Sequence, residues 1–326
     1  MNTMSKNEKI LWAVSACALV LLFLMSSTNL IIKERKVEIY PISVVIEDVN
    51  DDYYAGFRKG VDKAALEYHA DVSFITLYQR NNQEQQMELV TREMRDGAKA
   101  VILSPVNQQE TVLALDRNGP NSPLVILGSP IPNETMAANV AVDGYEMGKK
   151  LGEAAAAKQQ RENPVYLFTE GLAYGYNLRV YDGVRTSLEE AGFTCKLVER
   201  QDEDTFRRVI EEMVYPGSDR AAVVALDAPT LRETALILED SSVYRSHITG
   251  LYGVGGTTAL LNQLDKGIIQ GMVTYNRYDE GYLSVKRAVE AIQGIRQQDQ
   301  ILLESYYIEK SHLRDKEYEK MLYPLD

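Results

Sequence analysis

The feature that most constrains the fold is a regular alternation of short β-branched runs with segments of helical spacing, which begins near Val37. In the first half, the apolar runs predict strands that are buried on both faces, at 42–46, 72–75, 100–103 and 124–127. Helical spacing fills 54–68 and 83–95 between them. Strands that alternate with helices form parallel sheets, because each helix returns the chain to the same end of the sheet. The sequence therefore predicts an α/β fold with doubly wound parallel sheets.

The second half repeats this alternation. Its apolar runs predict strands at 165–168, 195–198, 221–226, 248–252 and 269–274, and its helical spacing predicts helices near 174–191, 205–213, 230–238 and 257–264. The alternating region is longer than one hydrophobic core usually organises. We therefore expect two α/β lobes.

The charge balance and the scarcity of cysteine and histidine exclude several kinds of partner. Among 326 residues, 35 are Lys or Arg and 47 are Asp or Glu, which gives a formal net charge of −12. Such a protein has no excess positive field to gather phosphates, so we expect no nucleic-acid partner. Its 2 cysteines and 3 histidines are too scattered for a disulfide scaffold or a metal site of short ligand spacing. We expect neither a metal nor a cofactor.

An uncharged run, residues 10–32, precedes the alternating region. As a helix it would rise about 34 Å, which spans a bilayer core of about 30 Å. We interpret it as an uncleaved single-pass membrane anchor, between a short tail at 1–9 and a juxtamembrane linker at 33–38. A cleaved signal peptide is one alternative, and a lipidated Cys17 is a second. Lysines and arginines flank both ends, so the positive-inside rule does not decide the orientation.

Five blocks in the alternating region resemble, in order, the sugar-binding members of the type I periplasmic binding protein family, of the ribose-binding kind. The blocks are 43–54 (SVVIEDVNDDYY, followed by Gly56 and Gly60), 97–105 (GAKAVILSP), 142–148 (VDGYEMG), 250–257 (GLYGVGGT) and 275–282 (YNRYDEGY). The first looks like a strand, loop and helix opening, and the last two resemble loops that close a cleft.

The resemblance implies two lobes joined by three hinge strands, with a small solute bound between them. The chain would cross between lobes near Val142, Tyr275 and Glu304. Lobe 1 would comprise 39–142 plus 276–304, and lobe 2 would comprise 143–275 plus 305–326. Open α/β sheets bind ligands beyond the carboxyl ends of their strands, and hinged closure around the solute is the expected motion.

A sugar cleft needs flat aromatic faces for the apolar side of the ring. The single tryptophan, Trp12, lies in the apolar run, so stacking falls to tyrosine or phenylalanine. Tyr53 and Tyr54 follow the first predicted strand, and further tyrosines lie where loops are expected to face the cleft, at Tyr174, Tyr176, Tyr252, Tyr275 and Tyr278. Because the chain has 20 tyrosines, packing between helices is the alternative for each.

The cleft also needs fixed polar groups for the sugar hydroxyls. The resemblance assigns this role to Asn50 and Asp51 in the first loop, to Arg179 and Asp227 in lobe 2, and to Asn276, beside the position of the family's terminal amide. An exposed helical charge is the alternative for Arg179, and a helix N-cap is the alternative for Asp227.

Some positions depart from the ribose-binding pattern. Gly128 and Ser129 stand where the family carries an Asp-Arg pair that clamps the sugar ring. Tyr252 and Tyr275 replace an aspartate and a glutamine. Losing charge-assisted hydrogen bonds lowers affinity for a fully hydroxylated monosaccharide, so a larger or more apolar ligand stays open.

The resulting expectation is an extracytoplasmic, membrane-anchored solute-binding protein rather than an enzyme. The expected ligand is a carbohydrate, and the expected partner is either a sensor histidine kinase or an ABC permease. An α/β enzyme acting on a small polar substrate is the alternative, although no nucleophile elbow or phosphate-binding loop supports it.

Overall fold

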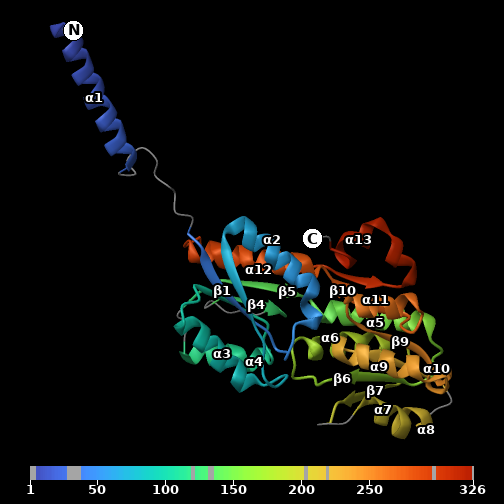
Figure 1. The fold of residues 1–326 in the computed structure, drawn as a ribbon. Helices are drawn as coiled ribbons and strands as arrows, with labels where there is room; N and C mark the ends of the chain where they lie inside the picture. The colour runs from blue at the N-terminus through green and yellow to red at the C-terminus, as the bar shows by residue number, and fades with distance from the viewer. Residues whose placement is uncertain are drawn as a thin grey trace. The chain divides into compact units, whose positions relative to one another are not determined.

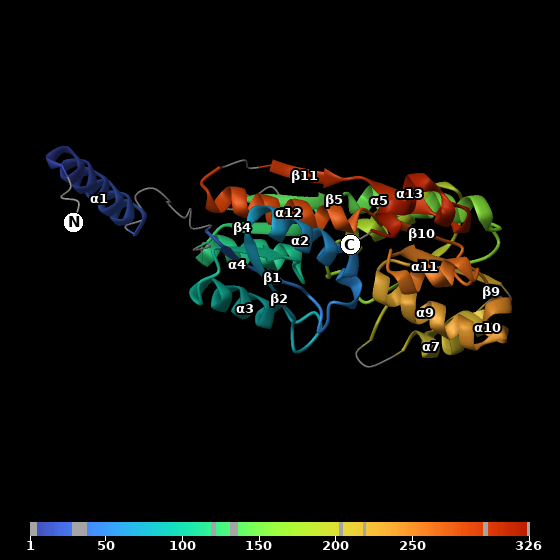
Figure 2. The ribbon, with the colours of Figure 1, turned by 45° about the horizontal axis from the view of Figure 1, so that its top comes forward.

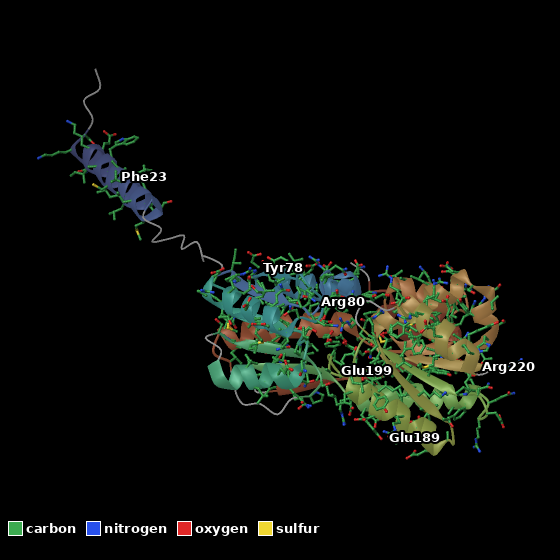
Figure 3. All side chains as sticks on the ribbon, turned by 90° about the horizontal axis from the view of Figure 1, so that it is seen from below. Phe23, Tyr78, Arg80, Glu189, Glu199 and Arg220 are labelled. Carbon is green, nitrogen blue, oxygen red and sulfur yellow. The ribbon has the colours of Figure 1, made fainter. Side chains whose placement is uncertain are left out.

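The computed structural model describes residues 5–27, 38–118, 122–130, 136–201, 205–217, 220–295 and 299–324. The chain divides into two compact units, Met1–Glu38 and Ile39–Asp326. The first unit contains helix α1 (Lys6–Ser27), the one helix among the described residues that is long and apolar enough to cross a membrane. Its side chains, including Phe23, project outward around the helix (Figure 3). The expected linker at 33–38 lies almost wholly outside the described residues.

The second unit contains two six-stranded sheets. The sheet of lobe 1 has the order β11-β5-β4-β3-β1-β2, and all its strands are parallel. These strands are β1 (Tyr40–Val45), β2 (Ala70–Ile75), β3 (Ala100–Leu103), β4 (Leu124–Gly128), β5 (Ala138–Val142) and β11 (Asp299–Leu303). Alternate residues face opposite layers, so Val44 packs with one core cluster and Val45 with another.

Helices cover both faces of this sheet (Figure 1). The Val44 side is covered by α2 (Ala55–Tyr68), which follows a 3-10 turn at Asp52–Tyr54, and by α12 (Arg277–Ile292). The Val45 side is covered by α3 (Gln83–Arg95) and α4 (Gln108–Asn118). This is the doubly wound arrangement that the sequence predicts.

The sheet of lobe 2 has the order β12-β10-β9-β8-β6-β7. Its strands are β6 (Val165–Thr169), β7 (Cys195–Glu199), β8 (Ala221–Ala225), β9 (Ile248–Val254), β10 (Gly271–Tyr275) and β12 (Ser305–Ile308). One face packs against α5 (Gly144–Lys158) and α6 (Asn177–Glu190). The other packs against α7 (Phe206–Val209), a π-helical turn (Ile210–Val214), α9 (Ala228–Asp240), α10 (Ser242–His247), α11 (Thr258–Asp265), a 3-10 helix (Lys310–Arg314) and α13 (Lys316–Leu322). The short α8 (Tyr215–Gly217) follows the π-helical turn and has no buried residue.

The chain crosses between the two sheets at three places: from β5 into α5, from β10 into α12, and from β11 into β12 (Figure 2). The third crossing explains the one antiparallel strand. β11 leaves its sheet beside Val142, at the carboxyl end of β5, and β12 enters the other sheet beside Tyr275, at the carboxyl end of β10. Because β12 starts at that end, it must run against β10.

Several elements were not predicted by the local pattern. The unpredicted strands are β5, β11 and β12, and the unpredicted helices include α4, α8, α10, α12 and α13. The expectation that all strands are buried on both faces is wrong for β2 and β7, whose residues are largely half-buried or exposed. Both lie at a sheet edge, where one side has no neighbouring strand.

Candidate functional site

A cleft of about 430 Å³ lies where the carboxyl ends of both sheets meet. Its walls come from the loops that follow the parallel strands, as expected for open α/β sheets. The charged side chains that line it are Glu47, Asp48, Lys59, Arg80, Glu170, Asp227, Arg277 and Glu280. No group of three or more His, Cys, Asp or Glu side chains that could hold a metal lies among the described residues.

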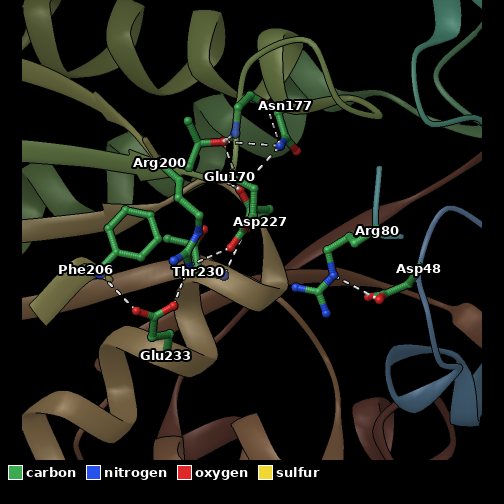
Figure 4. A network of polar contacts seen from close by, with 11 residues as sticks. Asp48, Arg80, Glu170, Asn177, Arg200, Phe206, Asp227, Thr230 and Glu233 are labelled. Carbon is green, nitrogen blue, oxygen red and sulfur yellow. Dashed lines mark hydrogen bonds and ion pairs between the residues drawn. The ribbon is translucent and has the colours of Figure 1, made fainter. Parts of the chain in front are cut away.

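On the lobe 1 wall, an ion pair joins the first two strand ends. Arg80, in the loop after β2, donates through Nε to Asp48 Oδ1 at 2.9 Å. Asp48 is buried, and the rest of the Arg80 guanidinium points toward lobe 2 (Figure 4). The positive field of Arg80 reaches Glu170 across the cleft and favours its ionised form. Arg80 thus presents donors to the cleft while one carboxylate holds it in place.

On the lobe 2 wall, Glu170 follows β6 and accepts a hydrogen bond from Arg200 Nη2 at 2.8 Å. Arg200 also pairs with Glu233, and its guanidinium lies over the Phe206 ring, 4.6 Å from the centroid. Burial raises the pKa of Glu170, and Arg200 opposes this rise. Glu170 therefore faces the cleft as a fixed acceptor whose charge is partly shielded from water.

Asp227, which follows β8, is fully engaged within lobe 2. Its Oδ1 accepts from the backbone N–H of Thr230, which makes it the N-cap of α9. Its Oδ2 accepts from Thr169 Oγ1 and the Glu170 N–H, both at 2.9 Å, and from Asn177 Nδ2 at 3.3 Å (Figure 4). Asp227 lines the cleft and at the same time ties three loops together.

At the hinge, a half-buried arginine is surrounded by aromatic rings. Arg277, at the start of α12, lies 4.8 Å from the Tyr54 ring centroid and 5.3 Å from that of Tyr275. Its Nη1 lies 2.9 Å from Glu280 Oε2. Burial by itself lowers the pKa of Arg277, but Glu280 and the surrounding tyrosines outweigh burial and raise it. The Arg277 guanidinium is therefore a fixed cation within a cage of aromatic rings.

Two polar side chains of the cleft, Glu47 and Ser129, are available to a ligand. Glu47 Oε2 accepts from the Tyr54 hydroxyl at 2.6 Å, and the same hydroxyl lies 2.8 Å from Ser104 Oγ. No cationic side chain among the described residues forms an ion pair with Glu47. Ser129 Oγ is buried at the cleft wall and has no hydrogen-bond partner there either. Buried polar atoms are normally satisfied, so a ligand hydroxyl would fit here.

The aromatic side chains of the cleft differ in accessibility. Tyr54 is only 3% exposed and belongs to the core under α2, whereas Tyr53 is half-buried. Tyr174 and Tyr176 also line the cleft from the loop before α6. Burial raises the pKa of Tyr176 to about 12, so its hydroxyl stays protonated. Tyr53 and Tyr176 are thus half-buried aromatic side chains of the cleft, one on each wall.

Six of the twelve candidate residues named from the sequence line the cleft: Tyr53, Tyr54, Tyr174, Tyr176, Asp227 and Tyr275. Tyr275 does so through a hydroxyl that donates to Glu280 Oε1 at 3.2 Å and accepts from Arg277.

The other six, Asn50, Asp51, Arg179, Tyr252, Asn276 and Tyr278, lie outside the lining residues. The side chains of Asn50 and Asp51 turn to their own loop and helix, where Asn50 accepts from the Asp52 N–H and Asp51 pairs with Arg58.

Three of the six have structural partners instead. Arg179 is exposed, 3.8 Å from Asp182, and its guanidinium lies over the Tyr145 ring. Tyr252 is fully buried in lobe 2, and its hydroxyl accepts from Gln159 Nε2 at 3.0 Å. Asn276 caps α12 by accepting from the Asp279 N–H.

Sequence reasoning did not select Glu47, Asp48, Arg80, Glu170 or Arg277. The sequence did contain a signal for Glu47, Asp48, Glu170 and Arg277. Each is among the first charged residues after a predicted strand, and the loops that follow parallel strands form the ligand site. For Arg80 this signal was weak, because four residues separate it from the end of β2.

Comparison with known proteins places this cleft in context. A sequence model described as the periplasmic binding protein domain matches residues 42–296. No curated protein shows significant sequence similarity to the chain.

Many solved structures share the fold. One is a carbohydrate transporter solute-binding protein from Agrobacterium radiobacter in complex with D-arabinose, with 15% identity, a TM-score of 0.79, and coverage of 88% of this chain and 100% of that one. Another is GanP, a glucose-galactose binding protein from Geobacillus stearothermophilus, with 20% identity, a TM-score of 0.72, and coverage of 85% and 99%. A third is a XylFII–LytSN complex, with 16% identity, a TM-score of 0.70, and coverage of 84% and 99%.

Proposed function

Because this chain belongs to the periplasmic binding protein family, we propose that its interlobe cleft binds a small carbohydrate or related polyol and closes around it. The family places the binding domain outside the cytoplasm, and the protein is a binding protein rather than an enzyme. The observation that carries the proposal is the composition of the cleft, in which fixed donors and acceptors alternate with tyrosine rings.

The charge pairing favours a neutral ligand. Arg80 and Arg277 are each paired with a carboxylate, so neither offers the uncompensated charge that a phosphate or carboxylate ligand would need. Glu47 and Ser129 instead present groups that suit hydroxyls. Dense hydroxyls on a ring with an apolar face are the chemistry that this arrangement matches.

We propose that Tyr53 stacks on the ring and that Arg80, Glu47 and Ser129 bind its hydroxyls. Tyr54, Asp227 and Tyr275 are proposed to shape the site, since their polar groups already have partners. Solved structures of the same fold hold D-arabinose, D-fucose and myo-inositol, which supports a polyol of this size.

The partner is proposed to be a sensor histidine kinase or an ABC importer. A protein of the same fold has been solved as a XylFII–LytSN complex, and several others are described as transporter components. We favour the sensor, because a membrane-spanning helix α1 would hold one copy beside a membrane kinase, whereas an importer needs freely diffusing or lipid-tethered copies.

A thermal-shift screen of the full chain in detergent tests the ligand class. We expect D-arabinose, D-galactose, D-tagatose or myo-inositol to raise the melting temperature by several degrees at about 100 times its Kd, because binding to the folded state stabilises by mass action. Glutamate and adenosine serve as comparison ligands. A shift with one of these and with no polyol would refute the proposal.

The stacking role has a matched pair of variants. Tyr53→Ala should weaken binding of the selected polyol at least about tenfold, measured by calorimetry, because it removes the accessible ring. Arg179→Ala, an exposed position outside the lining, should leave affinity unchanged. Equal affinities for Tyr53→Ala and the parent would place the stacking face elsewhere.

A further inference from the structure

The last segment of the chain is rooted in lobe 2. After β12, a 3-10 helix and α13 pack Leu313 and Leu322 into the core that α9 and α11 share, with Tyr318 and Met321 against the same cluster. The Tyr318 ring also packs edge-on against Tyr306 of β12. Helix α13 therefore moves with lobe 2.

Just beyond α13, the same segment contacts lobe 1. Lys59 Nζ, on α2, donates to the Pro324 carbonyl at 2.8 Å. Met321, Leu322, Tyr323 and Pro324 line the cleft together with Lys59 and Gly56 of lobe 1. The chain thus bridges the two lobes at a point that is not one of the three hinge crossings.

Other contacts between the described residues of the two lobes lie elsewhere on the cleft. The Gly175 N–H donates to the Val106 carbonyl at 2.9 Å, and Arg232 lies 3.9 Å from Asp52. The ion pair is exposed and lies beyond hydrogen-bond distance, so it contributes little. The contact through Lys59 is different, because the charged donor is within 2.8 Å of a carbonyl beside buried apolar groups.

We propose that Met321–Pro324 is a C-terminal strap that closes one flank of the cleft and holds the lobes in their closed arrangement. Hinge opening would carry α13 away from α2 and break the Lys59 contact, so the strap biases the closed state. Tyr323, which is 39% exposed, supplies an aromatic wall on that flank. Its side chain limits the size of any ligand group that extends toward it.

The strap rests on the proposed hinge motion, but its test needs no ligand. Leu66 on α2 and Val243 on α10 are 80% and 54% exposed, so each can be replaced by cysteine and spin-labelled. Double electron–electron resonance between the two labels then reports the distance between the lobes. The background is the full chain in detergent with Cys17→Ser and Cys195→Ser, which removes both native thiols.

We expect the parent to give one dominant short distance. Lys59→Met keeps the length of the side chain but removes its donors, and a chain ending at Leu322 removes the Pro324 carbonyl that accepts from Lys59. Both should lower the ratio of short to long distances by about tenfold, the effect typical of a hydrogen bond to a charged group. Lys63→Met, one turn further along α2 and exposed, is the matched control and should match the parent.

Distance distributions that are the same in the parent, Lys59→Met and the shortened chain would overturn the strap. That result would leave the polyol screen unaffected. Conversely, the absence of any polyol shift would refute the proposed ligand and leave the distance measurement valid. The two proposals therefore fail separately.

Discussion

Glu170 illustrates how the cleft holds charge at a cost to stability. Burial raises the pKa of its carboxyl group above the usual value, although Arg200 and Arg80 act against burial. An acid with a raised folded-state pKa binds more protons when folded than when unfolded. Its unfavourable contribution is therefore absent below the unfolded-state pKa, about 4.3, and grows as pH rises through the folded-state pKa.

The variant Glu170→Gln should remove this pH dependence. Relative to the parent, its free energy of unfolding should increase as pH rises from about 4 and level off above the folded-state pKa, because glutamine does not ionise. Denaturant unfolding of both proteins at pH 4, 5, 6 and 7 measures the difference. A difference that is constant with pH, or that falls, would contradict the pKa direction.

At the residue scale, Tyr53 could be predicted because it lies near a strand end. The direction in which a side chain points could not be predicted in this way. Asn50 and Asp51 lie in the same loop as Tyr53, yet local bonds to Asp52 and Arg58 turn them away. Arg277 was missed because its position in the sequence does not indicate that three aromatic rings surround its guanidinium. Tertiary partners decide these cases, and a single sequence does not contain them.

At the element scale, both lobes use the same device, a pair of helices in contact through glycine. On α2 and α12, a Cβ at Gly60 would meet the Tyr278 carbonyl, and one at Gly281 would meet the Phe57 carbonyl. On α5 and α6, a Cβ at Gly148 would likewise meet the Val180 carbonyl, and one at Gly183 would meet the Tyr145 carbonyl. Because backbone atoms form these contacts, the helices cannot relieve an added methyl group by a change of rotamer.

Gly60→Ala should therefore destabilise the protein by about 3 kcal/mol or more, the upper part of the range for overpacking. Gly56→Ala is the matched control on the same helix, since its Cβ would lie 3.4 Å from Arg277 Cβ, an ordinary contact. That change should be neutral or stabilise by up to about 1 kcal/mol through helix propensity. Thermal unfolding compares them, and similar melting temperatures would show that α2 and α12 separate easily.

The elements that periodicity predicted are those with their own apolar runs. β1, β3, β4 and β8 have such runs, and each lies in a sheet interior. β11 and β12 were not predicted, because their pairing partners, β5 and β10, lie far away in sequence. The resemblance to a known family supplied the three crossings, which no local pattern contained.

At the scale of the whole molecule, the three crossings make two independently packed lobes into one hinged body. Each lobe has core clusters on both faces of its sheet. Among the described residues, Tyr174 of lobe 2 reaches across the cleft and packs against a core cluster of lobe 1. Separately packed lobes joined by hinge crossings are the condition under which hinge closure responds to a ligand.

The last prediction concerns α1. Its apolar length suits a bilayer, and the family works outside the cytoplasm, so we expect the full chain to stay in the membrane fraction after a carbonate wash. A chain starting at Ile39 should be released. In intact cells, alkaline phosphatase fused to the C-terminus should be active, because the binding domain would lie outside. A mature protein whose N-terminus lies within or after α1, or is a lipidated Cys17, would show that α1 belongs to a cleaved leader rather than an anchor. An inactive fusion would show that the orientation is the reverse of the expected one.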